Sequence, residues 1–217
     1  MHYYINKNFI NVDGQCIHYR KIGRGPIIVL LHSSPQDGSF VLNPLIKLSK
    51  NFTLLAFDTP GYGLSDPLLI KWPTAYDYAQ AIIKAINLLK IKSCILYGTH
   101  TGAHIALEVA LFSNKVRCLI LDGISFNSPK EKNELLQNYL PSFVPEDGGG
   151  HLAKAWQHTR DQLIFYPWFK KNLIKNRLKQ NLADAEYINK VVVAKLLAGK
   201  NYIKGYSAAF KHDRIKA

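Results

Sequence analysis

The chain has 217 residues, which fits one domain of ordinary size, and 47% of them are hydrophobic, enough for a packed core. Its formal net charge of +13 would suit a nucleic-acid or anionic-lipid partner. The basic residues are spread over both halves of the chain, however, and no basic run alternates with aromatic residues. We therefore expect no nucleic-acid partner.

Cysteine usage and apolar runs indicate the compartment. The three cysteines, Cys16, Cys94 and Cys118, are odd in number and widely spaced, which argues against a disulfide framework. The first ten residues lack the apolar stretch of a secretory signal. The longest purely apolar run, Ile27 to Leu31, is far too short to span a membrane. These features predict a cytoplasmic protein with no membrane association.

Strands and helices are predicted to alternate in the first part of the chain. Two short strands flank an Asp-Gly turn, and a continuous apolar run is typical of a strand buried on both faces. The expected strands are 9–12, 15–21, 27–31, 52–57, 93–97 and 116–121, and the expected helices are 44–49, 74–89 and 103–112. This order predicts an α/β fold with a mostly parallel sheet flanked by helices. Ligands of such sheets bind at the carboxyl ends of the strands.

The pattern becomes helical after Ser128. The expected helices are 128–140, 151–165, 168–178 and 183–197, separated by prolines and glycines. Residues 128–207 are therefore predicted to form a helical cap or lid over a core made by residues 1–127. Residues 208–217 are predicted to lead into a further strand.

Three loops lie at predicted strand ends and carry recognisable motifs. They are the runs His32 to Pro35 (HSSP), Phe57 to Asp66 (FDTPGYGLSD) and Gly98 to Gly102 (GTHTG). Together they resemble the oxyanion loop, the turn after the fourth strand and the G-x-S-x-G nucleophile elbow of the α/β-hydrolase superfamily. The resemblance covers Phe9 to about Ile124, and it implies the superfamily's core fold for residues 1–127.

The sequence departs from the superfamily pattern in two places. The central residue of the elbow is His100 instead of serine, cysteine or aspartate. The resemblance also implies two more parallel strands after the cap, with a catalytic histidine behind the last of them. We therefore expect an incomplete α/β-hydrolase fold, in which residues 208–217 lead to a missing carboxyl-terminal segment.

The resemblance implies roles for four residues around the elbow. A neutral imidazole can attack a carbonyl group or act as a general base, so His100 is the expected catalytic residue. Asp122 ends the neighbouring predicted strand and is the candidate acid that orients His100. The backbone amides of Ser33 and Thr101 are the expected oxyanion hole.

The expected substrate pocket combines the oxyanion loop with the helical segment. Its candidate residues are His32, Ser34, Trp156, His158 and Trp168. Packing of the aromatic helix face on the core is an equally good interpretation of the last three. No metal is expected, since His151 and His158 stand two helical turns apart without a third ligand, and no cofactor motif is present.

The sequence thus predicts a hydrolase acting on a small, partly apolar molecule at an ester-like or C–C bond. Two alternatives stay open: a non-catalytic protein of the same fold that binds small molecules, and an inactive truncated fragment. In a fragment the strand over 116–121 would be an exposed sheet edge, and the chain is then expected to be poorly soluble. The pattern indicates no oligomeric state.

Overall fold

The computed structural model describes residues 4–125, 127–172, 174–179 and 181–213. Six strands form one sheet in the order β1-β2-β4-β3-β5-β6. Their bounds are β1 Asn6–Val12, β2 Gln15–Ile22, β3 Ile27–Leu31, β4 Thr53–Phe57, β5 Cys94–Thr99 and β6 Val116–Asp122. Strands β1 and β2 pair antiparallel, β2 pairs antiparallel with β4, and β4, β3, β5 and β6 run parallel. The predicted α/β class is confirmed.

The described part of the chain contains seven α-helices, of which α1, α2 and α3 cover the two faces of the sheet. They are α1 Gly38–Leu45, α2 Ala75–Leu88, α3 Thr101–Phe112, α4 Pro129–Asn138, α5 Gly150–Ile164, α6 Ala185–Ala198 and α7 Tyr202–Lys211. Short 3₁₀ turns occur at η1 Ile46–Lys50, η2 Ile174–Asn176 and η3 Gly199–Asn201. Capping boxes fix the beginnings of α2 at Thr74 and of α4 at Ser128.

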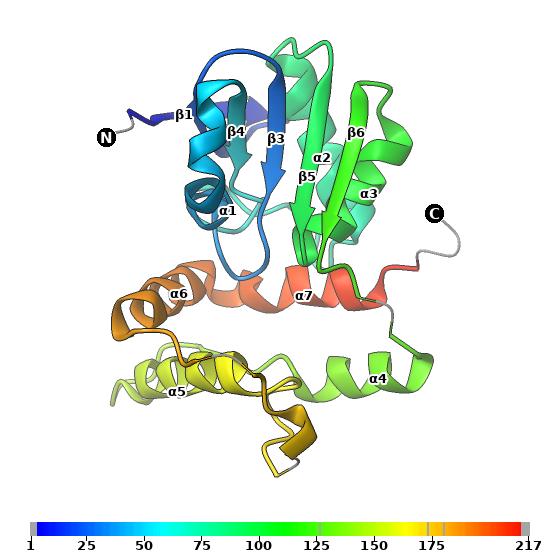
Figure 1. Cartoon of the computed structure of the whole chain (residues 1–217). Helices are drawn as coiled ribbons and strands as arrows, with labels where there is room; N and C mark the ends of the chain where they lie inside the picture. Colours follow the sequence, from blue (N-terminus) through cyan, green and yellow to red (C-terminus); the bar gives the residue numbers. More distant parts are fainter. Residues whose placement is uncertain (1–3, 126, 173, 180, 214–217) are drawn as a thin grey trace.

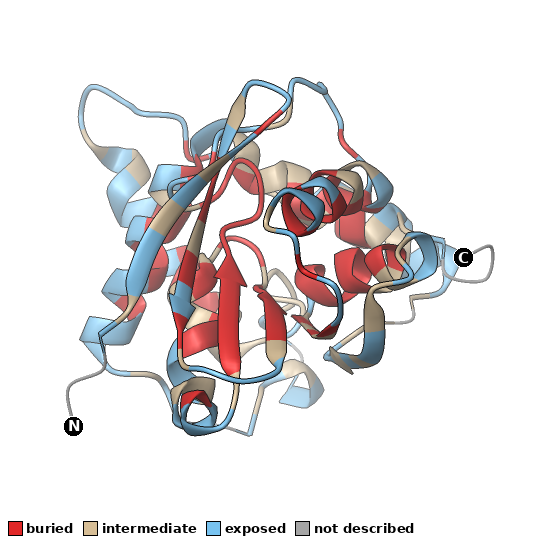
Figure 2. Ribbon diagram, turned by 90° about the horizontal axis from the view of Figure 1, so that it is seen from above, coloured by how far each residue is buried: buried red, intermediate tan, exposed pale blue. Residues whose placement is uncertain are grey.

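The core has two apolar layers because successive side chains of a strand point to opposite faces. Val29 and Leu31 of β3 pack in the layer under α2 and α3, while Ile28 and Leu30 pack in the layer under α1. Figure 2 shows the buried residues gathered in the central strands, with exposed residues on the outer helix faces. A continuous apolar strand is thus explained by cover on both sides.

Asp58 follows β4 directly and fixes the turn there. Its buried carboxylate accepts hydrogen bonds from His18 Nδ1 at 2.8 Å, from Arg20, and from the amides of Gly38 at 2.8 Å and Leu64 at 3.0 Å. Burial alone would raise the pKa of Asp58, but the His18 hydrogen bond and the Arg20 charge outweigh it and lower the pKa to about 2. The carboxylate therefore stays ionised and structural.

Helices α4 to α7, here called the helical block, lie at the carboxyl ends of the parallel strands. Helix α7 runs across those ends, with α4 and α5 beyond it (Figure 1). Tyr62, from the loop after β4, ties the block to the sheet: its hydroxyl donates to Asn201 O at 3.0 Å and accepts from Gly205 N at 2.9 Å. The block has its own apolar core around Phe143 and Tyr202.

One predicted helix does not form, and one helix was not predicted. Residues 168–178 do not form a helix, because the chain folds back on the end of α5: Tyr166 N–H donates to Asn176 O, and Leu178 N–H donates to Ile164 O. Residues 208–211 belong to helix α7, Tyr202–Lys211, for which no helix was predicted. Their buried alanines continue the helical spacing of Tyr202 and Gly205, a pattern that indicates one buried helix face. Residues 214–217 lie outside the described part.

Candidate active site

The run Gly98 to Gly102 makes a sharp strand-to-helix turn between β5 and α3. His100, at its apex, has φ 48° and ψ −111°, a backbone conformation that is costly for a residue with a side chain. A Cβ on Gly98 would lie 2.3 Å from Gly102 O, and one on Gly102 would lie 2.3 Å from Leu31 O. Only glycines fit at these two positions, so the turn packs tightly on the end of β3.

The His100 imidazole is exposed and borders a cavity of about 580 Å³. Its ring lies against Gly123, where an added Cβ would approach the ring Cε1 to 2.6 Å. The His100 amide donates to Asp122 O at 2.8 Å, which fastens the apex of the turn to the end of β6. The elbow therefore holds an imidazole at the edge of a cavity.

The cavity lies between the strand ends and the helical block. Its lining from the block is mainly aromatic and aliphatic, with a few polar groups: Tyr139, Thr159, Gln162, Leu163, Tyr166, Leu178, Tyr187, Val191, Tyr206, Ala209 and Phe210. From the core side it is bordered by Ser33, Ser34, Pro35, Gln36, His100, Thr101, His104, Gly123 and Ser125. Such a lining suits a small, partly apolar molecule with polar groups at one end.

Ser33 and Thr101, the residues expected to supply the oxyanion amides, line this cavity together with His100. Thr101 is the first residue of α3, so its N–H has no intrahelical acceptor. Ser33 is held by the neighbouring ring of His32, whose Nδ1 donates to Ser33 O at 2.9 Å while its Nε2 accepts the Thr59 N–H at 2.9 Å. Burial lowers the pKa of His32, which keeps this buried ring neutral and suits a hydrogen-bonding role.

The Asp122 carboxylate does not reach the His100 ring. It accepts a hydrogen bond of 2.6 Å from the hydroxyl of Tyr97, whose pKa is raised to about 12 by burial and by this carboxylate. The sheet register explains the geometry: Asp122 pairs with Thr99, two residues from Tyr97, and so shares its face of the sheet. In the described part of the chain, the His100 ring has no hydrogen-bond partner, so the expected orienting contact is absent from this structure.

Of the five predicted pocket residues, Ser34 borders the cavity and the other four do not. His32 is buried beneath the loop that it supports. His158 and Trp168 pack edge to face with ring centroids 4.5 Å apart, and the Trp168 indole donates to Tyr139 O. Trp156 packs against the apolar core of the block. These residues stabilise the helical block, because α5 turns its Thr159, Gln162 and Leu163 side to the cavity instead.

His104 is a cavity residue that the sequence interpretation missed. It stands four residues after His100, and residues at that spacing lie on one face of a helix. The run GTHTGAH therefore contained the signal. The aromatic residues of α7 were missed for another reason, since no helix was predicted over residues 202–211.

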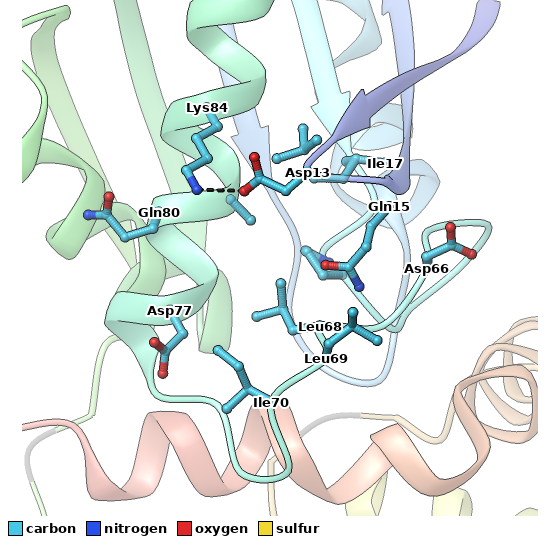
Figure 3. A pocket seen from close by; sticks show the side chains of 13 residues that line it. Asp13, Gln15, Ile17, Asp66, Leu68, Leu69, Ile70, Asp77, Gln80 and Lys84 are labelled. Carbon is cyan, nitrogen blue, oxygen red and sulfur yellow. Dashed lines mark hydrogen bonds and ion pairs between the residues drawn. The ribbon is translucent and has the colours of Figure 1, made fainter.

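A second hollow, of about 290 Å³, lies beside the β1–β2 turn and shares no lining residue with the elbow cavity. Figure 3 shows Asp13 paired with Lys84 across it, at 2.5 Å. Asp66 accepts the Cys16 N–H, and Asp77 closes the capping box of α2. The carboxylates of this hollow thus hold turns and a helix end.

Two kinds of feature are absent from the described residues. No group of three or more histidine, cysteine, aspartate or glutamate side chains there could hold a metal ion. No helix in that part is long and apolar enough to cross a membrane.

Comparison with known proteins identifies the family. Residues 26–155 match the model of the alpha/beta hydrolase fold family. The chain belongs to this family. The matched residues include the loop His32 to Pro35 and the turn Gly98 to Gly102.

The relatives of this alpha/beta hydrolase chain include several hydrolases. It is 37% identical over 105 residues to a 2-(acetamidomethylene)succinate hydrolase from Mesorhizobium japonicum, covering 46% of this chain and 36% of the relative. It is 30% identical over 120 residues to Epoxide hydrolase 3 from Siraitia grosvenorii, covering 54% and 38%. The matches thus span less than two-fifths of these relatives' lengths.

Solved structures show the same fold. An epoxide hydrolase from Vigna radiata superimposes with a TM-score of 0.69 at 17% identity, over 96% of this chain and 72% of that one. The epoxide hydrolase CorEH gives a TM-score of 0.70 at 18% identity, over 98% and 75%. At these identities the likeness concerns the fold alone.

Proposed function

We propose that this chain forms the core and helical cap of a hydrolase that cleaves an ester-like or C–C bond in a small, partly apolar molecule. The observation that carries the proposal is the strained elbow, which holds the His100 imidazole at a cavity beside the Ser33 and Thr101 amides. Residues 128–207 would serve as the cap, because they supply the apolar side of that cavity.

The elbow supports hydrolysis through two groups of this chain. The His100 ring would attack the substrate carbonyl carbon or take a proton from water. The Thr101 amide, at the amino end of α3, and the Ser33 amide would stabilise negative charge that develops on the carbonyl oxygen. The aromatic lining, made by Tyr139, Tyr166, Tyr187, Tyr206 and Phe210, would hold the apolar part of the substrate.

A second candidate function is binding of a small molecule without turnover. The observation that favours it is the engagement of the Asp122 carboxylate by Tyr97, which leaves the His100 ring without an orienting acid in the described part. An imidazole that is not held by a partner is a weaker base and nucleophile than one in a triad. Both hydrolysis and binding without turnover would use the same cavity.

The test uses a panel of p-nitrophenyl esters with acyl chains of increasing length. If hydrolysis is the function, His100→Ala lowers kcat/KM by about a hundredfold or more. The matched control is His151→Ala, because His151 lies outside the cavity lining and is expected to keep its rate. Wild-type protein that quenches tyrosine fluorescence on binding the esters but releases no p-nitrophenol would establish the second candidate. Neither binding nor turnover would refute both.

A further inference from the structure

Three titratable side chains form a chain of contacts at the wall of the elbow cavity. His104 and Glu108 stand four residues apart on α3 and so lie on one face of that helix. Helix α7 packs against α3, and His212 follows the last residue of α7. His104 Nδ1 lies 3.1 Å from His212 Nδ1, and His212 Nε2 lies 2.5 Å from Glu108 Oε1.

All three side chains are shielded from solvent. His104 is 3% exposed, and the side chains of His212 and Glu108 are 7% and 9% exposed. His104 also borders the cavity that His100 borders. Catalytic triads likewise place a buried carboxylate behind an imidazole that faces the active site. Here a second imidazole, that of His212, lies between the carboxylate and the cavity-lining imidazole.

The contacts define the tautomers of both rings. The Glu108 carboxylate can only accept, so His212 Nε2 carries a proton. When His212 is neutral, its Nδ1 is therefore an acceptor, and His104 Nδ1 must donate to it. It follows that the proton of a neutral His104 sits on Nδ1, and its Nε2 is the basic nitrogen.

We propose that His104 is a catalytic base of the elbow cavity, with His212 and Glu108 as positioning residues that complete an imidazole–imidazole–carboxylate relay. This inference rests on the proposed hydrolysis. Glu108 would thus serve His104 as an orienting acid through His212, whereas the Asp122 carboxylate does not reach the His100 ring.

In ester hydrolysis the relay takes one proton from water and later returns it to the leaving group. Water gives one proton to His104 Nε2 while its oxygen forms a bond to the carbonyl carbon. His104 Nδ1–H passes its proton to His212 Nδ1, and the resulting imidazolium stays paired with the Glu108 carboxylate. The bond between the carbonyl carbon and the leaving oxygen then breaks, and the proton returns by the reverse path to the leaving alkoxide.

The geometry does not fit a metal site. His212 uses its two ring nitrogens on different partners, so the donor atoms of the three residues do not converge on one point. Two lysines near the end of α7 have other partners: Lys132 Nζ donates to Lys211 O, and Lys211 Nζ lies over the Trp72 ring. Among the described residues, His100 precedes the relay along the chain and Asp213 follows it directly.

The experiment joins tautomer detection with kinetics on the whole chain. Long-range ¹H–¹⁵N NMR spectra of ¹⁵N-histidine-labelled protein should show the Nδ1–H tautomer for His104 and the Nε2–H tautomer for His212. Glu108→Gln should lower kcat for a p-nitrophenyl ester about tenfold or more and move the acidic limb of its pH profile, with KM nearly unchanged. Glu186→Gln, at an exposed glutamate of α6, is the matched control and should do neither.

The outcomes separate this inference from the proposed function. If wild-type protein hydrolyses esters but His104→Gln and Glu108→Gln keep its rate and pH profile, the relay is refuted while hydrolysis stands. An Nε2–H tautomer on His104 refutes it as well, and this measurement needs no turnover. If the tautomers are as expected and no ester is hydrolysed, both the proposed hydrolysis and the catalytic role of His104 are refuted. His212→Asn is the second variant, should Glu108→Gln melt too low to assay.

Discussion

Lys195 provides a quantitative test of how the helical block is built. Its side chain is fully buried, and its Nζ contacts His158 Nδ1 at 2.7 Å, Thr159 Oγ1 at 2.7 Å and Gln162 Oε1 at 3.2 Å. Among the described residues no carboxylate pairs with it. Burial without a counter-charge lowers the pKa of Lys195 from 10.5 to about 7. Protonation of this amine therefore opposes folding.

The sign and size of the effect follow from proton linkage. Between pH 7 and pH 10.5 the unfolded chain carries a proton on this lysine that the folded chain tends to lose. The free energy of unfolding therefore rises with pH through this window, and it decreases again as the pH falls toward the folded pKa. From about pH 7 to about pH 8.5 the free energy of unfolding should increase by about 1.5 kcal/mol on account of Lys195 alone.

The assay is urea unfolding of wild type and Lys195→Met at about pH 7 and about pH 8.5. Methionine keeps most of the apolar length of lysine but cannot titrate, so the variant should lose the pH-dependent increment. Lys190→Met is the matched control, because Lys190 lies on the same helix in an exposed ion pair with Glu186. A Lys195→Met protein that keeps the wild-type pH dependence would refute the burial argument.

Three further predictions concern the elbow, the turn after β4 and the sheet edge. Gly123→Ala should displace the His100 ring and lower ester turnover about tenfold or more in the p-nitrophenol assay, while Gly148→Ala, where the added methyl meets nothing within 4 Å, should not. Asp58→Asn should lower the free energy of unfolding at neutral pH by about 2 kcal/mol or more in urea titrations, since four donors lose an ionised acceptor; an unchanged midpoint would contradict this. Ile120→Lys, on the exposed edge strand β6, should reduce the concentration dependence of light scattering; equal scattering would show that this edge does not drive association.

The central strands β3 and β4 were predictable because burial on both sheet faces selects a continuous apolar run. The run 27–31 is a strand with the predicted bounds, and the predicted start of a helix at Thr74 matches the N-cap of α2. The helix predicted at 44–49 instead begins at Gly38, since the Asp37 side chain caps it by accepting the Ser39 N–H. Proline is common at the first position of a helix, so the predicted helix began at Pro44, although Pro44 lies inside α1.

The site was predictable only as far as local motifs reach. The loops containing Ser33 and His100 could be placed at strand ends, because connection order fixes which ends meet. The rotation of α5 about its axis decides whether Trp156 or Gln162 faces the cavity, and no local pattern records it. In the same way, the sheet register and not the sequence spacing sends Asp122 toward Tyr97.

The role of the elbow imidazole can be measured by its reaction with an acyl donor in the cavity. Protein mixed with an activated ester, quenched in acid within the turnover time and mapped by peptide mass spectrometry, should carry the acyl group on His100 when that ring is the nucleophile. His100→Ser protein should carry it on the new hydroxyl, since the elbow presents either side chain at the same place. Rapid ester hydrolysis in which wild-type His100 stays unmodified and His100→Ala keeps the full rate would contradict a catalytic role for His100.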